Sequence, residues 1–146
     1  MSEQEDQFQQ RRSHLDRLKE AGANPFAIHS FDRTHTSVQA VERIENIEEE
    51  AGGPEEVDWN ETGFECRVAG RLMAVRDQGK SIWADLQDGW GRIQLWARQD
   101  ELGDEQLERF RNLNIGDIIG VGGSAFRTRR GEPTVRAQSY QLLSKA

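Results

Sequence analysis

The chain of 146 residues contains a single cysteine, Cys66, and no run of apolar residues long enough to cross a bilayer. One thiol excludes an internal disulfide framework and is typical of a reducing compartment, so we expect a cytoplasmic protein with no membrane partner. Cys66 occupies an inward position of an expected strand, which favours a small buried hydrophobe over a reactive thiol. The first twelve residues, MSEQEDQFQQRR, lack the apolar stretch of a signal peptide.

The sequence also lacks the residue patterns that chemistry requires. Its three histidines, His14, His29 and His35, are scattered without the paired spacing of metal ligands. There is no phosphate-binding GxxxxGK[ST] motif, no dinucleotide-binding GxGxxG motif, and no nucleophile elbow or catalytic triad. We therefore expect no catalytic residue, no metal and no cofactor in this chain, which leaves binding as its function.

Charge is distributed unevenly along the chain. The net charge of −7 argues, taken whole, against a polyanionic partner. Residues 1–61 hold 6 basic and 15 acidic side chains, whereas residues 62–146 hold 13 basic and 11 acidic ones, a net of +2. Five of those eleven acids fall in one expected helix, so the expected strands and their hairpins form a basic surface.

The N-terminal region is expected to be helical. The sequence predicts a helix over 5–21, an extended connector over 23–35 and a second helix over 36–50. At the start of this second helix, Thr36 and Gln39 form a capping-box pattern. The buried stripe of the same helix is expected to consist of Val41, Ile44 and Ile47. Three glutamates, 48–50, sit badly at the negative C-terminus of that helix, so we expect this end to fray into an acidic loop. We expect residues 1–61 to be a helical appendage with an acidic linker, and residues 62–146 to form the second region, a barrel.

From residue 62 the pattern changes to short strands, expected at 64–75, 81–88, 91–98, 116–127 and 133–143, with a helix near 101–112. Gly70 in the first strand indicates a bulge or bend. Five strands with a helix between the third and fourth predict a mainly β fold, a five-stranded Greek-key barrel of the OB type. Such barrels bind with the outer face of strands two and three and with the loops that here span 77–80 and 127–133.

Alternation along the second and third strands sorts their side chains onto two faces. Ile82, Ala84 and Leu86 point one way, and Trp83, Asp85 and Gln87 the other. Aromatic rings, amides and guanidinium groups on one exposed face suit single-stranded nucleic acid. Burial of both tryptophans under another part of the fold is an equally good interpretation of this stretch alone.

The candidate binding residues follow from this arrangement. Arg71, Trp83, Gln94 and Trp96 share the outer face, and Arg76, Lys80, Arg127, Arg129 and Arg130 rim it. Glu132 stands in the last basic loop, either as an ion-pair partner for Arg129 or Arg130 or as an acceptor for a base N–H. The residues alone favour the ion pair.

Much of the chain resembles a known family. The segments GRLMAVRDQGKSIWADLQDGWGRIQLW, NIGDIIGVGGSAFRTRRGEP and QLLSKA, together with AGANPF and RTHT, are similar to the anticodon-binding domain of class II lysyl-tRNA synthetases. The resemblance covers about residue 11 to Ala146. The resemblance implies that the outer face binds the anticodon of lysine tRNA. The central base of that anticodon is uracil.

The resemblance also implies roles for single residues. Trp83, where the family usually has phenylalanine, would stack on a base, and Gln94 would read a base edge. Arg71 is the family's first-strand arginine, and Glu132 becomes a base reader under this interpretation.

The class II catalytic motifs are missing, so the chain is expected to be an excised N-terminal domain or a free-standing relative that does not activate lysine alone. ATP and Mg²⁺ would belong to the catalytic domain of the parent ligase, which is expected to be a homodimer. Two alternatives stay open: a general single-strand-binding OB module, and a protein-interaction domain that docks a partner through acidic helices.

Overall fold

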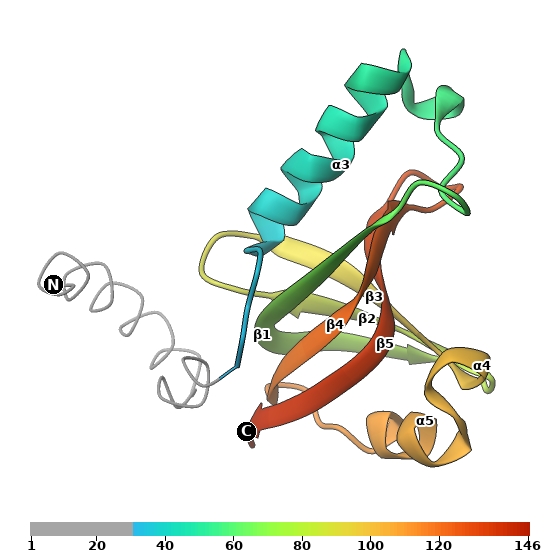
Figure 1. The fold of residues 1–146 in the computed structure, drawn as a ribbon. Coiled ribbons are helices and arrows are strands. Elements are labelled where there is room, and N and C mark those ends of the chain that lie inside the picture. Colours follow the sequence, from blue (N-terminus) through green and yellow to red (C-terminus); the bar gives the residue numbers. More distant parts are fainter. Residues whose placement is uncertain (1–30) are drawn as a thin grey trace, which may run out of the picture.

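The computed structural model describes residues 31–146, and five strands form its centre (Figure 1). The strands are β1 (Phe64–Asp77), β2 (Ser81–Gln87), β3 (Arg92–Arg98), β4 (Ile118–Arg127) and β5 (Pro133–Ser144). The helices are α3 (Ser37–Ala51), the 3₁₀ turn η1 (Pro54–Glu56), α4 (Gln99–Leu102) and α5 (Asp104–Arg111). The helix expected over 5–21 and most of the expected connector lie outside the described residues.

The strands close into a barrel in the order β1-β2-β3-β5-β4. All neighbours are antiparallel except β3 and β5, whose parallel pairing closes the barrel. The expected mainly β fold, a five-stranded OB barrel with a helical segment between β3 and β4, is confirmed. That segment is two short helices, α4 and α5, because Gly103 breaks it with a φ of 86°.

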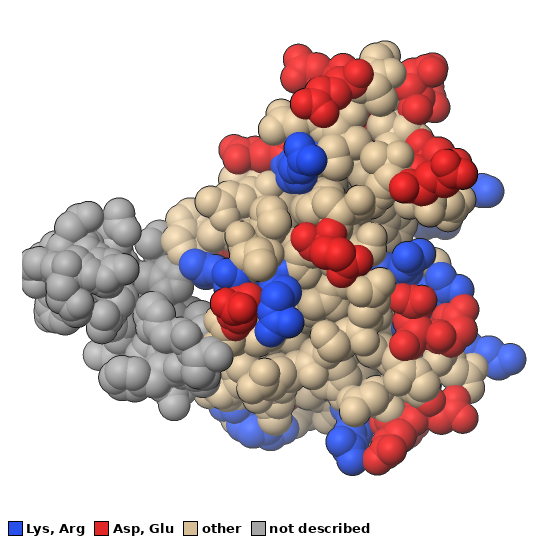
Figure 2. Space-filling model, viewed as in Figure 1, with Lys and Arg blue, Asp and Glu red and all other residues tan. Residues whose placement is uncertain are grey.

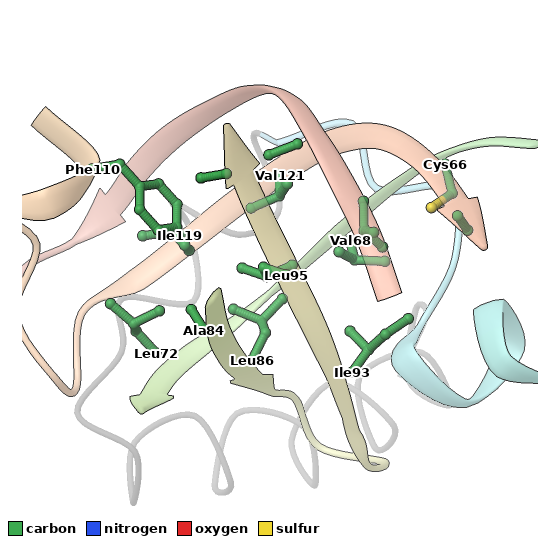
Figure 3. Close-up of a cluster of buried hydrophobic side chains, with 14 of the residues drawn as sticks. Cys66, Val68, Leu72, Ala84, Leu86, Ile93, Leu95, Phe110, Ile119 and Val121 are labelled. Atoms are coloured by element: carbon green, nitrogen blue, oxygen red, sulfur yellow. The ribbon is translucent and has the colours of Figure 1, made fainter. Parts of the chain in front are cut away.

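The core fills the barrel with side chains from the inward positions of every strand. Val68, Leu72 and Leu86 are almost completely buried there (Figure 3). Phe110 from α5 lies near Ile119 at one end of this cluster, well separated from Cys66 at the other end (Figure 3). Ala40 and Ile44 of α3, both fully buried, belong to the same cluster. The N-terminal helix therefore packs into the barrel's own core.

Helix α3 begins as the sequence predicts. Thr36 caps it, and Thr36 and Gln39 form the reciprocal capping box. Its C-terminal end differs from the expectation of fraying. The helix runs to Ala51 and ends on Gly52 in the left-handed region, and Glu48 is buried with 5% of its surface exposed. The helix stays intact because the carboxylate of Glu48 faces an arginine, described below.

Two glycine expectations have different outcomes. The bulge expected at Gly70 lies further along β1, where the pairing register with β2 shifts between Leu72 and Ala74. Gly70 serves close packing instead, because a Cβ there would approach the carbonyl oxygen of Gln87 to 2.5 Å. Strand β4 approaches another backbone closely, as expected: a Cβ at Gly123 would overlap the carbonyl oxygen of Arg136.

Charged side chains are distributed unevenly over the helices at the surface. The face seen in Figure 2 carries carboxylates over α3 and the loop after it, and mixed charges around α4 and α5. Within residues 31–146, no helix combines the length and apolar character that crossing a membrane requires.

Candidate nucleic-acid interface

The outward side chains of β1, β2 and β3 form three rows across the barrel. In the first row Trp83 pairs with Arg76 on β1 and with Trp96 on β3. In the second row Asp85 pairs with Gln94. The third row holds Arg71, Gln87 and Arg92. The alternation in the sequence therefore brings the expected aromatic and polar residues onto one face.

Trp83 and Trp96 stack on each other in the first row. Their ring centroids are 4.8 Å apart and their planes differ by 8°. The ring centroid of Trp96 also lies 6.0 Å from that of Phe126, and the guanidinium of Arg98 lies 4.6 Å from the Trp96 centroid. No further ring or cation contact of Trp83 occurs within the described part of the chain. Both tryptophans are half-buried. Because Phe126 and Arg98 contact Trp96 and not Trp83, we call Trp96 the inner, supported ring and Trp83 the outer ring of the pair.

A hydrogen-bond chain orients the second row. Arg76 donates to Asp85 at 3.2 Å and to the Oε1 atom of Gln94 at 3.1 Å. Gln94 in turn donates from Nε2 to the hydroxyl of Thr134, 3.0 Å away. A primary amide has two acceptor lone pairs and two N–H donors, so Gln94 keeps one of each for a ligand. Its neighbours thus fix the direction in which a base edge would be read.

A hollow of about 260 Å³ opens beside this network. Its lining is formed by Arg76, Asp85, Arg92, Ile93, Gln94 and Glu132. Two exposed side chains, Arg92 from β3 and Glu132 from the β4–β5 loop, bring opposite charges to the same hollow. The hollow therefore offers both hydrogen-bond donors and a carboxylate acceptor next to the tryptophan pair.

The β4–β5 loop holds Glu132 through its backbone. Thr128 N–H donates to the carbonyl of Glu132 at 3.0 Å, and the amide of Glu132 donates to the hydroxyl of Thr128 at 3.0 Å. Gly131 makes the turn with a φ of 93°. Within residues 31–146 no ion pair joins Glu132 to Arg129 or Arg130. The ion pair favoured by the residues alone is therefore not formed, and both arginines are exposed at the loop tip.

Arg127, which was expected to rim this face, directs its guanidinium to α3 and to its own loop. Its Nε and Nη2 donate to the two carboxylate oxygens of Glu48 at 2.5 and 2.9 Å, and its Nη1 donates to the carbonyl of Gly131 at 2.8 Å. Hydrogen bonding to Glu48 raises the pKa of Arg127 above its ordinary value. This guanidinium is thus already committed to α3 and to its own loop.

The remaining expected residues occupy the edges. Lys80 is exposed in the β1–β2 loop. Arg111 of α5 anchors the start of this loop, because its Nε atom donates to a carboxylate oxygen of Asp77 at 2.7 Å. Arg71 is half-buried two rows from Trp83, and its Nε is buried without a hydrogen-bond partner in the described chain. The structure thus brings Arg76, Trp83, Gln94, Trp96 and Glu132 together, and leaves Arg71, Lys80, Arg129 and Arg130 around them.

Sequence reasoning missed three residues that build this site. Asp85 and Arg92 line the hollow, and Thr134 orients Gln94. Arg92 carried a usable signal, because it precedes Gln94 by two positions and so shares its face. Thr134 carried none, because only the parallel pairing of β3 with β5 places it opposite Gln94.

A closed five-stranded barrel of this strand order, with a helical segment between β3 and β4, is an OB fold. The family model described as "OB-fold nucleic acid binding domain" matches residues 66–143, more than half of the chain, and the chain belongs to this family. More particularly, it is similar to the N-terminal region of lysine–tRNA ligases over nearly its whole length.

The ligase from Bacillus subtilis is 39% identical over 141 residues, which are 97% of this chain and 27% of the ligase. The ligase from Dehalococcoides mccartyi is 40% identical over 137 residues, 94% of this chain and 26% of the ligase. The ligase from Staphylococcus epidermidis is 40% identical over 144 residues, 99% of this chain and 28% of the ligase. This chain therefore spans about a quarter of the length of these relatives.

A solved structure shares the fold. The asparaginyl-tRNA synthetase from Pyrococcus horikoshii superposes with a TM-score of 0.54 and 21% identity, covering 63% of this chain and 22% of that one. Among residues 31–146, no group of three or more histidines, cysteines and carboxylates is placed to hold a metal ion.

Proposed function

We propose that this barrel is the anticodon-binding domain of a lysine–tRNA ligase and that its β1–β2–β3 face reads the anticodon of lysine tRNA. The stacked pair of Trp83 and Trp96 beside a polar hollow carries this proposal. The family and the similarity to lysine–tRNA ligases support the class of partner.

Stacking would supply much of the affinity. An anticodon base placed on the face of Trp83 that points away from Trp96 would extend the existing two-ring stack. Each base stacked on an aromatic side chain contributes roughly 1–3 kcal/mol. Since Trp96 is held by Phe126 and Arg98, Trp83 is presented to the base without losing much freedom on binding.

Hydrogen bonds in the hollow would supply the choice of base. The free donor and acceptor of Gln94 fit a base edge, and the carboxylate of Glu132 accepts a hydrogen bond from a base N–H. Uracil donates from its ring N3–H, whereas cytosine has an unprotonated N3 and donates from its exocyclic amino group. A carboxylate held opposite ring position 3 therefore favours uracil over cytosine. A carboxylate is therefore useful in this basic loop as a base reader and unfavourable as a phosphate contact.

Exposed cations around the face would contact phosphates. Lys80, Arg129 and Arg130 are exposed and make no ion pair within the described residues. Such contacts set the register of an RNA strand but carry no sequence information. The half-buried Arg71 and the exposed Arg92 complete the basic border of the third row.

In the parent ligase, lysine activation with ATP and Mg²⁺ would occur in a catalytic domain outside this chain. Under this proposal the partners of the chain within the ligase are that catalytic domain and a second ligase subunit, and the ligase works in the cytoplasm. We also propose that residues 62–146 form the RNA-binding barrel and that residues 1–61 form its helical appendage, whose helix α3 packs on the barrel.

The test is equilibrium binding of the chain to three RNAs by fluorescence anisotropy at low salt. They are a lysine anticodon stem-loop, the same loop with cytosine at the central position, and poly-U. We expect the unaltered loop to bind best. Equal binding of poly-U and both loops would show a general single-strand module, and no RNA binding at low salt would favour a protein-interaction domain.

A further inference from the structure

One ion pair joins two parts of the chain that are distant in sequence and stand next to the proposed site. Glu48 lies in the last turn of α3, and its side chain is 7% exposed. Arg127 is the last residue of β4, and its side chain is 23% exposed. Both oxygens of the carboxylate accept hydrogen bonds from the guanidinium.

The same guanidinium reaches into the loop that presents Glu132. The Nη1 atom of Arg127 donates to the carbonyl of Gly131, the residue directly before Glu132. Thr128 and Thr134 then hold the backbone of Glu132, because both donate to its carbonyl oxygen. A continuous chain of contacts thus runs from α3 through Arg127 to the residue that faces the hollow.

Stability alone gives little reason for this pair. Removing two charges from water costs about as much as their attraction returns, so a buried pair is often no more stabilising than two apolar side chains. A carboxylate at the C-terminal end of a helix is also unfavourable. What the pair does provide is a fixed distance and direction between α3 and the β4–β5 loop.

We propose that Glu48 and Arg127 are positioning residues that hold the β4–β5 loop in the conformation from which Glu132 reads its base. Arg127 does not contact RNA, and Glu48 acts only through Arg127. This inference rests on the proposed function, because it assigns the pair to the accuracy of base reading at the same site.

Three variants separate positioning from charge. Glu48→Gln removes one charge inside the protein, at a residue that this proposal does not place in contact with RNA. The double variant E48M/R127M removes both charges together and keeps apolar bulk, so it folds without a buried unpaired charge. Glu49→Gln is the matched control, since Glu49 is the exposed neighbour of Glu48 on the same helix turn.

Each variant is titrated with the uracil and cytosine forms of the lysine anticodon stem-loop at several salt concentrations. A hydrogen bond to a charged group contributes about 1.5–3 kcal/mol, so its loss reduces the uracil preference about tenfold or more. We expect this reduction for Glu48→Gln and for E48M/R127M, with the salt dependence unchanged, and none for Glu49→Gln. Full preference in Glu48→Gln would overturn the inference. A lower salt dependence in E48M/R127M, with equal weakening for both loops, would show that Arg127 contacts phosphate.

A measurement without RNA tests the same tether. Amide hydrogen exchange at Thr128, Gly131 and Glu132 is expected to speed up in Glu48→Gln and to stay unchanged in Glu49→Gln. Unchanged exchange in Glu48→Gln would overturn the inference. If the unaltered chain shows no uracil preference, the proposed function fails, whereas a preference that survives Glu48→Gln contradicts the positioning role alone.

Discussion

Trp83 and Trp96 stand directly opposite each other on β2 and β3 and stack nearly parallel, with 4.8 Å between their ring centroids. Phe126 and Arg98 contact Trp96, whereas within residues 31–146 only Trp96 makes a ring contact with Trp83. The pair therefore has a supported inner ring and an outer ring. A base that joins this stack meets Trp83 first, which makes Trp83 the residue whose loss should be felt most by RNA.

Replacing Trp83 by alanine should weaken binding of the lysine anticodon stem-loop by about tenfold or more, because one base loses its stacking surface. Trp83→Phe keeps a flat ring and should lose much less. Fluorescence anisotropy measures both affinities, and thermal unfolding confirms that both variants are folded. Equal affinity of Trp83→Ala and the unaltered chain would remove Trp83 from the site.

Gln94→Ala should reduce the preference for the uracil loop and leave the salt dependence of binding unchanged, because the amide reads a base edge and carries no charge. Gln87→Ala is the matched control, since Gln87 is an exposed glutamine on the same face, one row further from the tryptophans. Competition between the uracil and cytosine loops measures the preference. Equal effects of the two alanine variants would contradict base reading by Gln94.

The double variant R129Q/R130Q should bind all RNA loops more weakly and with a smaller salt dependence. Each lost phosphate contact on a single strand lowers the slope of log K against log salt by about 0.7. Arg109→Gln serves as control, because Arg109 pairs with Glu105 on α5. An unchanged slope in the double variant would show that the loop tip does not touch the RNA backbone.

Much of the fold was readable from periodicity. Alternation in β2 and β3 identified the outward tryptophans, and Thr36 with Gln39 identified the start of α3. The fraying expected at the other end of α3 was wrong. The helix-dipole argument counted the charge of Glu48 but had no means to see Arg127, which is 79 positions away.

The candidate site was readable only in part for the same reason. Strand alternation places Trp83 and Gln94 on one face, but it does not report what those side chains touch. The contact of Trp83 with Trp96 depends on the register between two strands, and the orientation of Gln94 depends on Thr134 in β5. Long-range register is set by the whole barrel, so local pattern cannot supply it.

Gly123→Ala should destabilise the barrel by about 3 kcal/mol or more, because the new Cβ would meet a backbone oxygen that cannot move aside. That oxygen is the backbone carbonyl of Arg136, which a Cβ at position 123 would overlap. Gly79→Ala is the comparison: its φ of 87° is strained but its surroundings are open, so it should cost about 1 kcal/mol. Urea unfolding measures both, and equal values would contradict the close approach of β4 and β5.

Cys66 should make stability fall at alkaline pH. Burial raises the pKa of this thiol to about 12, above its ordinary value of 9.0. Between these values the unfolded chain loses the thiol proton while the folded chain keeps it, so the free energy of unfolding decreases as pH rises. The slope reaches about 1.4 kcal/mol per pH unit. The difference in free energy of unfolding between the unaltered chain and Cys66→Ala isolates this contribution. A difference that stays constant from about pH 8 to 11 would contradict it.

The most direct measurement of the binding face is an NMR titration of the chain with the lysine anticodon stem-loop. We expect the largest shifts at the indole N–H of Trp83, the side-chain amide of Gln94 and the backbone amide of Glu132, with little change along α3 and α5. Shifts confined to the acidic helices, with Trp83 and Gln94 unaffected, would contradict recognition of RNA by this face.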